Sequence, residues 1–367
     1  MVRRIISIAA FLALLSVSPA GADQVAAEQL MKAHERKVEL WMSAMADAEN
    51  PKTRDLILTR RPDEGAQLER LWRQVENHLD EGWVIEPLAW MLARPAAWVG
   101  IPEGERVGAF NAVMDAIEHA LIINPDLGKL MPALANLEHQ RCLGVVNKVI
   151  STNPSDKVKA SAHVAAAIIL RRIGDAPKIM NQRREHLRKA LELGGDAPFG
   201  RGLVIDVVKD ELYRVKNLNV GKQSPTFSLR DQDDLEVNLL NYRSRVTVLV
   251  FWSLDSSICV QSVPTMNALL ADLGALKDNV AMLGVVNNAP SELREFLKKN
   301  EMTFDNLVDP GGRVTHDYRV DILPMVYILD QQGRVAYKGE LSPLLRPKIE
   351  ELAVTGESSG VLPAPRP

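Results

Sequence analysis

Cysteine is scarce in this chain of 367 residues, which holds two, Cys142 and Cys259. Two cysteines allow at most one disulfide within the chain, and this excludes a small fold held together by several disulfides. The seven histidines are dispersed, and none is expected to form a metal-ligand pair with a cysteine. No nucleotide-binding loop or hydrolase triad is found either. The sequence therefore predicts no metal site and no cofactor.

An excess of charge of one sign is also missing. The formal net charge is −3 and the basic residues are scattered, so nothing in the sequence points to nucleic acid as a partner. The hydrophobic fraction of 46% and the charged fraction of 25% are ordinary for a soluble globular protein.

Long apolar runs are absent except near the N-terminus. Ile5 to Val17 is apolar, follows Arg3 and Arg4, and precedes the small residues Ala20-Gly21-Ala22. This order is typical of a signal peptide with its cleavage site, and the run is short for a membrane span. We expect residues 1–22 to be a signal peptide and the mature chain to be exported, in bacteria to the periplasm. The alternative is an uncleaved anchor, which is the only way in which the sequence places the chain at a membrane.

Residues 23–216 show helical spacing of apolar residues and no convincing strand. The clearest stripe comprises Val158, Ala162, Ala165, Ile169 and Ile173. Asn-Pro pairs, in which Asn caps a helix and Pro suits its first turn, predict three helix starts. These pairs begin at Asn50, Asn124 and Asn153. We expect an all-α domain, whose hairpins could repeat.

Residues 217–354 have the pattern of an α/β domain with a mixed central sheet flanked by helices. Near-continuous apolar runs predict buried strands; these cover 246–252, 280–286, 325–329 and 335–337, after a hairpin formed by 227–229 and 237–239. Helical spacing follows at 259–273, 291–299 and 344–352. Residues 355–367, rich in Gly, Ser and Pro, are expected to form a disordered tail.

One motif in this domain carries chemical information. The predicted strand 246–252 ends in Phe251-Trp252 and is followed by Ser256-Ser257-Ile258-Cys259 at the start of a helix. Further anchors stand in a fixed order along the chain: Val220-Gly221-x-x-x-Pro225-x-Phe227-x-Leu229, Cys259-x-x-x-x-Pro264, Leu323-Pro324 and Tyr327-Ile328-Leu329-Asp330-x-x-Gly333. Over residues 219–354 the sequence resembles the thioredoxin-like redoxin family. This family contains the exported TlpA- and ResA-like thiol–disulfide oxidoreductases and, more distantly, the AhpC/TSA peroxiredoxins.

The resemblance implies a redox site that is degenerate in this chain. The family pattern places its two cysteines at Ser256 and Cys259, its second Trp at Asp255 and its Glu at Ser262. In a dithiol enzyme the first cysteine attacks the substrate disulfide as a thiolate and the second resolves the mixed disulfide. A serine hydroxyl has no disulfide chemistry, so an ordinary dithiol cycle within this motif is excluded.

The resemblance also implies a binding surface. In relatives, a cis proline faces the redox site and the backbone of the residue before it pairs with bound peptide. Pro324 is the expected cis proline, and Leu323 is the expected pairing residue. We assign substrate binding to Leu323 and Pro324 together with Trp252.

The role of Cys259 has four interpretations from sequence. It is a buried core residue, a disulfide partner of Cys142 or of another chain, a peroxidatic thiol whose peroxide Ser256 helps to place, or a single thiol in some other exchange reaction. Cys142 lies on the apolar face of a predicted helix with Val145 and Val149, and we expect it in the core.

The leading hypothesis from sequence is therefore an exported, redoxin-family protein that binds a protein or peptide near Pro324 and has lost most or all thiol–disulfide oxidoreductase activity. The alternative is an enzyme, a thiol oxidoreductase or peroxidase, that uses Cys259 alone. A third hypothesis is a purely structural protein whose helical domain binds a partner. A thiol or disulfide client is the expected partner, and the sequence specifies no oligomeric state.

Overall fold

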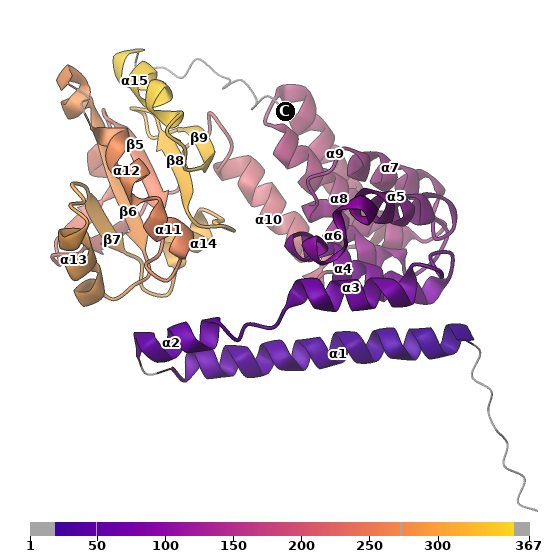
Figure 1. The fold of residues 1–367 in the computed structure, drawn as a ribbon. Coiled ribbons are helices and arrows are strands. Elements are labelled where there is room, and N and C mark those ends of the chain that lie inside the picture. Colours follow the sequence, from indigo (N-terminus) through magenta and orange to yellow (C-terminus); the bar gives the residue numbers. More distant parts are fainter. Residues whose placement is uncertain (1–18, 49, 272–273, 356–367) are drawn as a thin grey trace, which may run out of the picture. The chain divides into compact units, whose positions relative to one another are not determined.

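The structure, a computed structural model, describes residues 19–48, 50–271 and 274–355. It divides the chain into two compact units, Met1–Val208 and Lys209–Pro367, and this division falls inside a helix rather than after residue 216 (Figure 1). Most of the predicted signal peptide and nearly all of the predicted C-terminal tail lie outside the described residues. No helix among the described residues is long and apolar enough to cross a membrane.

The N-terminal unit is built almost entirely from helices. The α-helices are α1 (Pro19–Ala46), α2 (Pro51–Leu58), α3 (Glu64–Val75), α4 (Ile85–Leu92), α5 (Glu103–His119), α6 (Met131–Asn136), α7 (Arg141–Thr152), α8 (Asp156–Ile173), α9 (Pro177–Gly194) and α10 (Val204–Asn217), the last of which enters the second unit. Three short 3-10 helices, η1 (Gly82–Val84), η2 (Pro95–Gly100) and η3 (Leu127–Leu130), connect some of them. The sequence predicted no strand here, and this is corrected by a small antiparallel hairpin. Its strands, β1 (Pro198–Phe199) and β2 (Gly202–Leu203), have two residues each.

Helix α8 is central to the core of this unit. Every residue from 160 to 170 is buried, as expected of a helix that is covered all round. The helix begins with Ser155 as N-cap, whose side chain accepts from the backbone NH of Val158, and ends at Gly174, whose φ of 140° suits glycine. Ile173, the last residue of the predicted apolar stripe, is 58% exposed.

The Asn-Pro pairs are helix starts in one case of three. Asn50 caps α2 and accepts from the backbone NH of Thr53 at 3.0 Å. Asn153 instead ends α7, where it is buried and donates to the carbonyls of Ile122 at 2.7 Å and Asn124 at 3.1 Å. The second and third pairs thus tie two turns together, which corrects the predicted helix starts.

The C-terminal unit contains a seven-stranded mixed sheet in the order β4-β3-β7-β6-β5-β8-β9. Its strands are β3 (Ser228–Asp231), β4 (Glu236–Asn238), β5 (Val246–Phe251), β6 (Val280–Val286), β7 (Asp305–Val308), β8 (Met325–Leu329) and β9 (Val335–Glu340). Strands β5, β6 and β7 run parallel, and β8 runs antiparallel to β5. The predicted mixed sheet and its central strand β5 are confirmed, whereas β7 was not predicted.

Alternating side chains of β5 face two separate hydrophobic cores. Val248 and Val250 pack on one face with residues of α12, α13 and α15, whereas Leu249 and Phe251 pack on the other with α14 and two buried tyrosines, Tyr318 and Tyr327. The helices of this unit are α11 (Ser257–Gln261), α12 (Val263–Leu270), α13 (Pro290–Lys299), α14 (Arg313–Asp317) and α15 (Leu345–Thr355), with the 3-10 helices η4 (Leu239–Tyr242) and η5 (Gly274–Asn279). The sheet is therefore the middle layer, and its carboxyl edge carries the loop of the redoxin motif.

A pair of histidines joins α8 to α9 in the N-terminal unit. The Nδ1 atoms of His163 and His186 lie 2.8 Å apart, which requires that one ring donate and the other accept. Burial, followed by the neighbouring His186, lowers the pKa of His163 to about 4, and burial also lowers the pKa of His186. Both rings are therefore neutral at pH 7.

This pair predicts a loss of stability in mild acid. The unfolded His163 has an ordinary pKa near 6.5, so the unfolded state binds more protons between about pH 6.5 and 4, and stability falls as the pH falls through that window. We expect a loss of about 3 kcal/mol across it, at 1.36 kcal/mol for each pKa unit. Urea unfolding followed by circular dichroism at 222 nm measures it. His163→Gln, which keeps a donor and an acceptor but does not titrate, should show a shallower slope; equal slopes would contradict the assignment.

Candidate functional site

Ser256 occupies the position of the missing cysteine and caps helix α11. Its backbone is extended, with φ −99° and ψ 110°, and its hydroxyl accepts from the backbone NH of Cys259 at 3.4 Å. Serine is among the preferred N-cap residues because its oxygen satisfies an NH that the helix itself leaves unpaired. The residue that would be the attacking thiol in a dithiol site is thus a helix cap.

Cys259 lies in the third position of α11 and is fully buried, with 0% exposure. It belongs to the hydrophobic core under the sheet, together with Trp252 and Met266. Cys142 is equally buried in the core of the N-terminal unit, as predicted, and burial raises the pKa of its thiol. Both cysteines are free thiols in the structure.

Trp252, which directly follows the central strand β5, is held inside the protein. It is 1% exposed, and its indole NH donates to the side-chain oxygen of Asn306 on β7 at 2.9 Å. Gly284 on β6 lies between them: a Cβ at this glycine would stand 1.9 Å from Oδ1 of Asn306 and 2.8 Å from Nε1 of Trp252. Because the indole is covered, it cannot contact a substrate, which corrects the predicted role of Trp252. It instead packs in the core beside the loop that follows β5.

Asn288, which follows β6, fixes the turn after Trp252. Its side-chain oxygen accepts from the backbone NH of Leu254 at 2.9 Å and from the hydroxyl of Ser253 at 3.2 Å, and its amide donates to Asp255 at 3.1 Å. Asn288 is 7% exposed, so these bonds are shielded from water. Sequence reasoning missed both Asn288 and Asn306; the place of Asn288 just after an apolar strand was an available signal, whereas Asn306 lies in the unpredicted strand β7.

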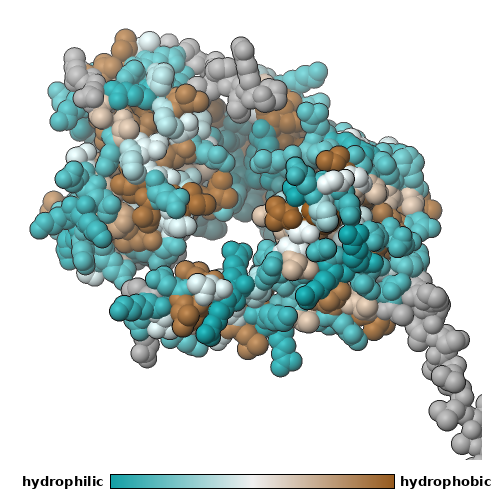
Figure 2. Space-filling model, in the orientation of Figure 1, coloured by the Kyte–Doolittle hydropathy of each residue, from teal (hydrophilic) through white to brown (hydrophobic). Residues whose placement is uncertain are grey.

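Pro324 follows a cis peptide bond, as predicted, and Leu323 is 36% exposed. The register of β5 with β8 pairs Phe251 with Met325, so Pro324 lies beside the end of the central strand, next to the Ser256 loop. Ile322 and Ile258 are also exposed, at 55% and 62%. We call Ile258, Ile322 and Leu323 the apolar rim; in Figure 2 brown residues of this kind are interspersed among teal ones on the visible surface.

The segment before the cis proline is anchored to the end of α10. Arg214 donates to the carbonyl of Arg319 and to both carboxylate oxygens of Asp321, each at 2.9 Å. Arg319 in turn donates to Asp210 at 2.9 Å and lies over the ring of Tyr213 at 4.1 Å. These contacts fix the chain on the side from which Leu323 is presented.

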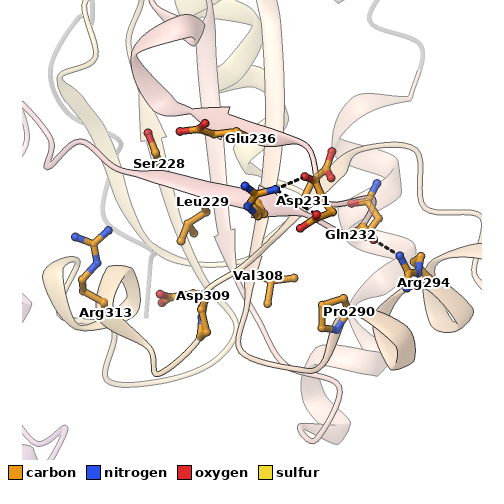
Figure 3. A pocket seen from close by; sticks show the side chains of 13 residues that line it. Ser228, Leu229, Asp231, Gln232, Glu236, Pro290, Arg294, Val308, Asp309 and Arg313 are labelled. Carbon is orange, nitrogen blue, oxygen red and sulfur yellow. Dashed lines mark hydrogen bonds and ion pairs between the residues drawn. The ribbon is translucent and has the colours of Figure 1, made fainter.

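A cavity of about 660 Å³ opens beside β3 and β7 (Figure 3). Two of its arginines have partners in the lining: Arg230 pairs with Asp234, and Arg294 donates to the backbone carbonyl of Gln232 at 3.0 Å. The side chain of Gln232 accepts from the backbone NH of Asn306 at 2.9 Å. The wall of this cavity therefore supports the residue that holds Trp252.

The described side chains offer little reactive chemistry at this site. No group of three or more His, Cys, Asp or Glu is placed to hold a metal ion within the described ranges. His316, which the sequence offered nearest to the final hairpin, lies on α14 and contacts Arg319. The arrangement presents a capped helix, a covered thiol and an apolar rim.

Gly284→Ala tests the packing beneath Trp252. We expect a loss of about 2–3 kcal/mol in the free energy of unfolding, because the added methyl overlaps the side chain of Asn306. Asn306→Ala removes the overlapping atoms, so the double variant should lose less than the sum of the two single losses. Urea unfolding measures all three, and strict additivity would count against the overlap.

The burial of both thiols predicts that neither reacts while the protein is folded. A disulfide reagent added to native protein should release almost no thiolate chromophore, and both thiols should react in denaturant. The Cys142→Ser variant shows which of the two cysteines releases any chromophore that the native protein gives. Rapid reaction of native Cys259 would show that it is accessible and would favour the single-thiol enzyme.

Comparison with known proteins covers the C-terminal unit. Residues 220–338 match the model of the AhpC/TSA family. The chain is 24% identical over 127 residues to the thiol–disulfide oxidoreductase ResA of Bacillus thuringiensis subsp. konkukian, covering 34% of this chain and 73% of ResA. It is 28% identical over 129 residues to the thioredoxin-like protein YneN of Bacillus subtilis, covering 34% and 74%. A solved thiol–disulfide oxidoreductase from Bacteroides fragilis is similar at 23% identity and a TM-score of 0.33, covering 36% of this chain and 99% of that one.

The sheet order, the cis proline and the matched residues agree on one assignment. Residues 220–338 of this chain match the AhpC/TSA family model, and over this segment the chain is similar to thiol–disulfide oxidoreductases.

Proposed function

We propose that this protein is an exported, thioredoxin-like binding protein that takes a protein or peptide at the apolar rim and carries out no dithiol exchange. The observation that carries the proposal is the state of the two motif positions. Ser256 is a helix cap and Cys259 is 0% exposed, so neither the attacking nor the resolving step has an available sulfur.

The binding part of the proposal rests on the surface that remains. Ile322 and Leu323 are exposed just before Pro324. Arg214 fixes the preceding residue, Asp321, and Asn288 fixes the loop that follows Trp252. Keeping exposed apolar side chains on a rigid support favours association, because little conformational entropy is lost on binding. The proposed export rests on the sequence of residues 1–22 alone.

Restoring the missing sulfur tests whether the frame is intact. Ser256→Cys should give a chain that reduces insulin disulfides in the presence of dithiothreitol, because a cysteine at this N-cap stands three residues from Cys259 at a helix N-terminus. The unmodified chain and Ser256→Ala should stay at background. Activity of the unmodified chain above background would overturn the proposal.

A single-thiol variant tests the rim. The double variant Ser256→Cys with Cys259→Ala has an attacking thiol and no resolving one, so a bound client with a disulfide should remain attached as a mixed disulfide. Non-reducing electrophoresis of the exported protein detects the adduct. Adding Leu323→Asp, which places a charge on the rim, should reduce the yield severalfold; an unchanged yield would show that the rim does not bind the client.

A further inference from the structure

The N-terminal unit contains a cavity of about 360 Å³ between η2, the first half of α5 and the segment that joins α6 to α7. This volume lies within the range of about 300–1,000 Å³ usual for small-molecule sites. The walls are mostly apolar or aromatic and include Trp98, Phe110 and Leu137.

The aromatic wall is preformed. The ring of Phe110 lies 6.2 Å from Trp98 in an edge-on arrangement and 4.5 Å from the ring of His139. The indole NH of Trp98 is occupied by the carbonyl of Met91 at 3.1 Å. Such fixed rings suit a flat apolar group, which gains contact area without ordering the wall.

Arg106 provides the polar element of this cavity. Arg106 is half-buried: its Nε is covered by protein, and the terminal nitrogens are the part of the guanidinium left for a ligand in the cavity. Glu138, the other charged residue of the lining, is exposed. It interacts electrostatically with Arg172: burial lowers the pKa of Arg172, and Glu138 raises it. A guanidinium that lines a mostly apolar cavity is suited to a carboxylate, which it binds with charge-assisted hydrogen bonds.

We propose that this cavity binds a small aromatic monocarboxylate, with its ring against Phe110 and its carboxylate on Arg106. The aromatic wall selects the flat apolar end of the ligand, and the guanidinium selects its charge. This proposal is independent of the thioredoxin-like unit.

A titration of the full chain with three fluorinated probes tests the ligand class by ¹⁹F NMR. The probe 4-fluorophenylacetate should bind saturably with a Kd of about 1 mM or tighter, well within the efficiency reached by small ligands. The neutral 4-fluorobenzyl alcohol should bind more weakly and the cationic 4-fluorophenethylamine not measurably. Equal affinity of the three probes, or no saturable binding of the carboxylate, would overturn the proposal.

Variants locate the binding. Arg106→Gln should weaken the carboxylate about tenfold, as expected for the loss of one charge-assisted hydrogen bond, and leave the alcohol unchanged. Val107→Asp, at a lining position that is 71% exposed and therefore safe for folding, should also weaken the carboxylate. Arg184→Gln, an exposed arginine on α9 outside the lining, is the matched control and should bind as the unmodified chain does. An unchanged carboxylate affinity in both lining variants would refute the site.

Discussion

The hydrogen bond from the indole of Trp252 to Asn306 is the contact on which the site loop depends. It joins the end of β5 to β7 across β6, and it exists because Gly284 has no side chain to fill the space. The loop starts immediately after this tryptophan, and Asn288 then fixes its next three residues. Amide groups and one glycine therefore hold the frame of a redox site. No sulfur takes part in that support, so the loop is held in place with a serine at position 256.

The sheet was largely readable from sequence because its central strands are covered on both faces. Val246–Phe251, Val280–Val286 and Met325–Leu329 are near-continuous apolar runs, and such runs have few alternatives to a buried strand. β7 was missed because it spans four residues, Asp305–Val308, and opens with two polar ones. One of these, Asn306, is fully buried and has partners on two distant segments, Trp252 and Gln232. A local pattern contains no information on those partners.

Features of the site that depend on one position or a short motif could be predicted from the sequence. Features that depend on contacts between distant segments could not. Ser256 in place of cysteine, the cis bond before Pro324 and the core position of Cys142 follow from short motifs or helical spacing. The second role of Asn153, which ties one turn to another instead of starting a helix, depends on carbonyls in a distant turn. The same holds for the cavity around Arg106, whose walls come from segments that only the fold brings together.

The cap formed by Ser256 gives the loop a single covalent form. A pair of cysteines at these positions has two, and the balance between them follows the reduction potential of the surrounding thiols. Here the hydroxyl of Ser256 accepts from the NH of Cys259 under any such potential. The loop is consequently the same in an oxidising as in a reducing thiol environment, because positions 256 and 259 cannot form a disulfide with each other.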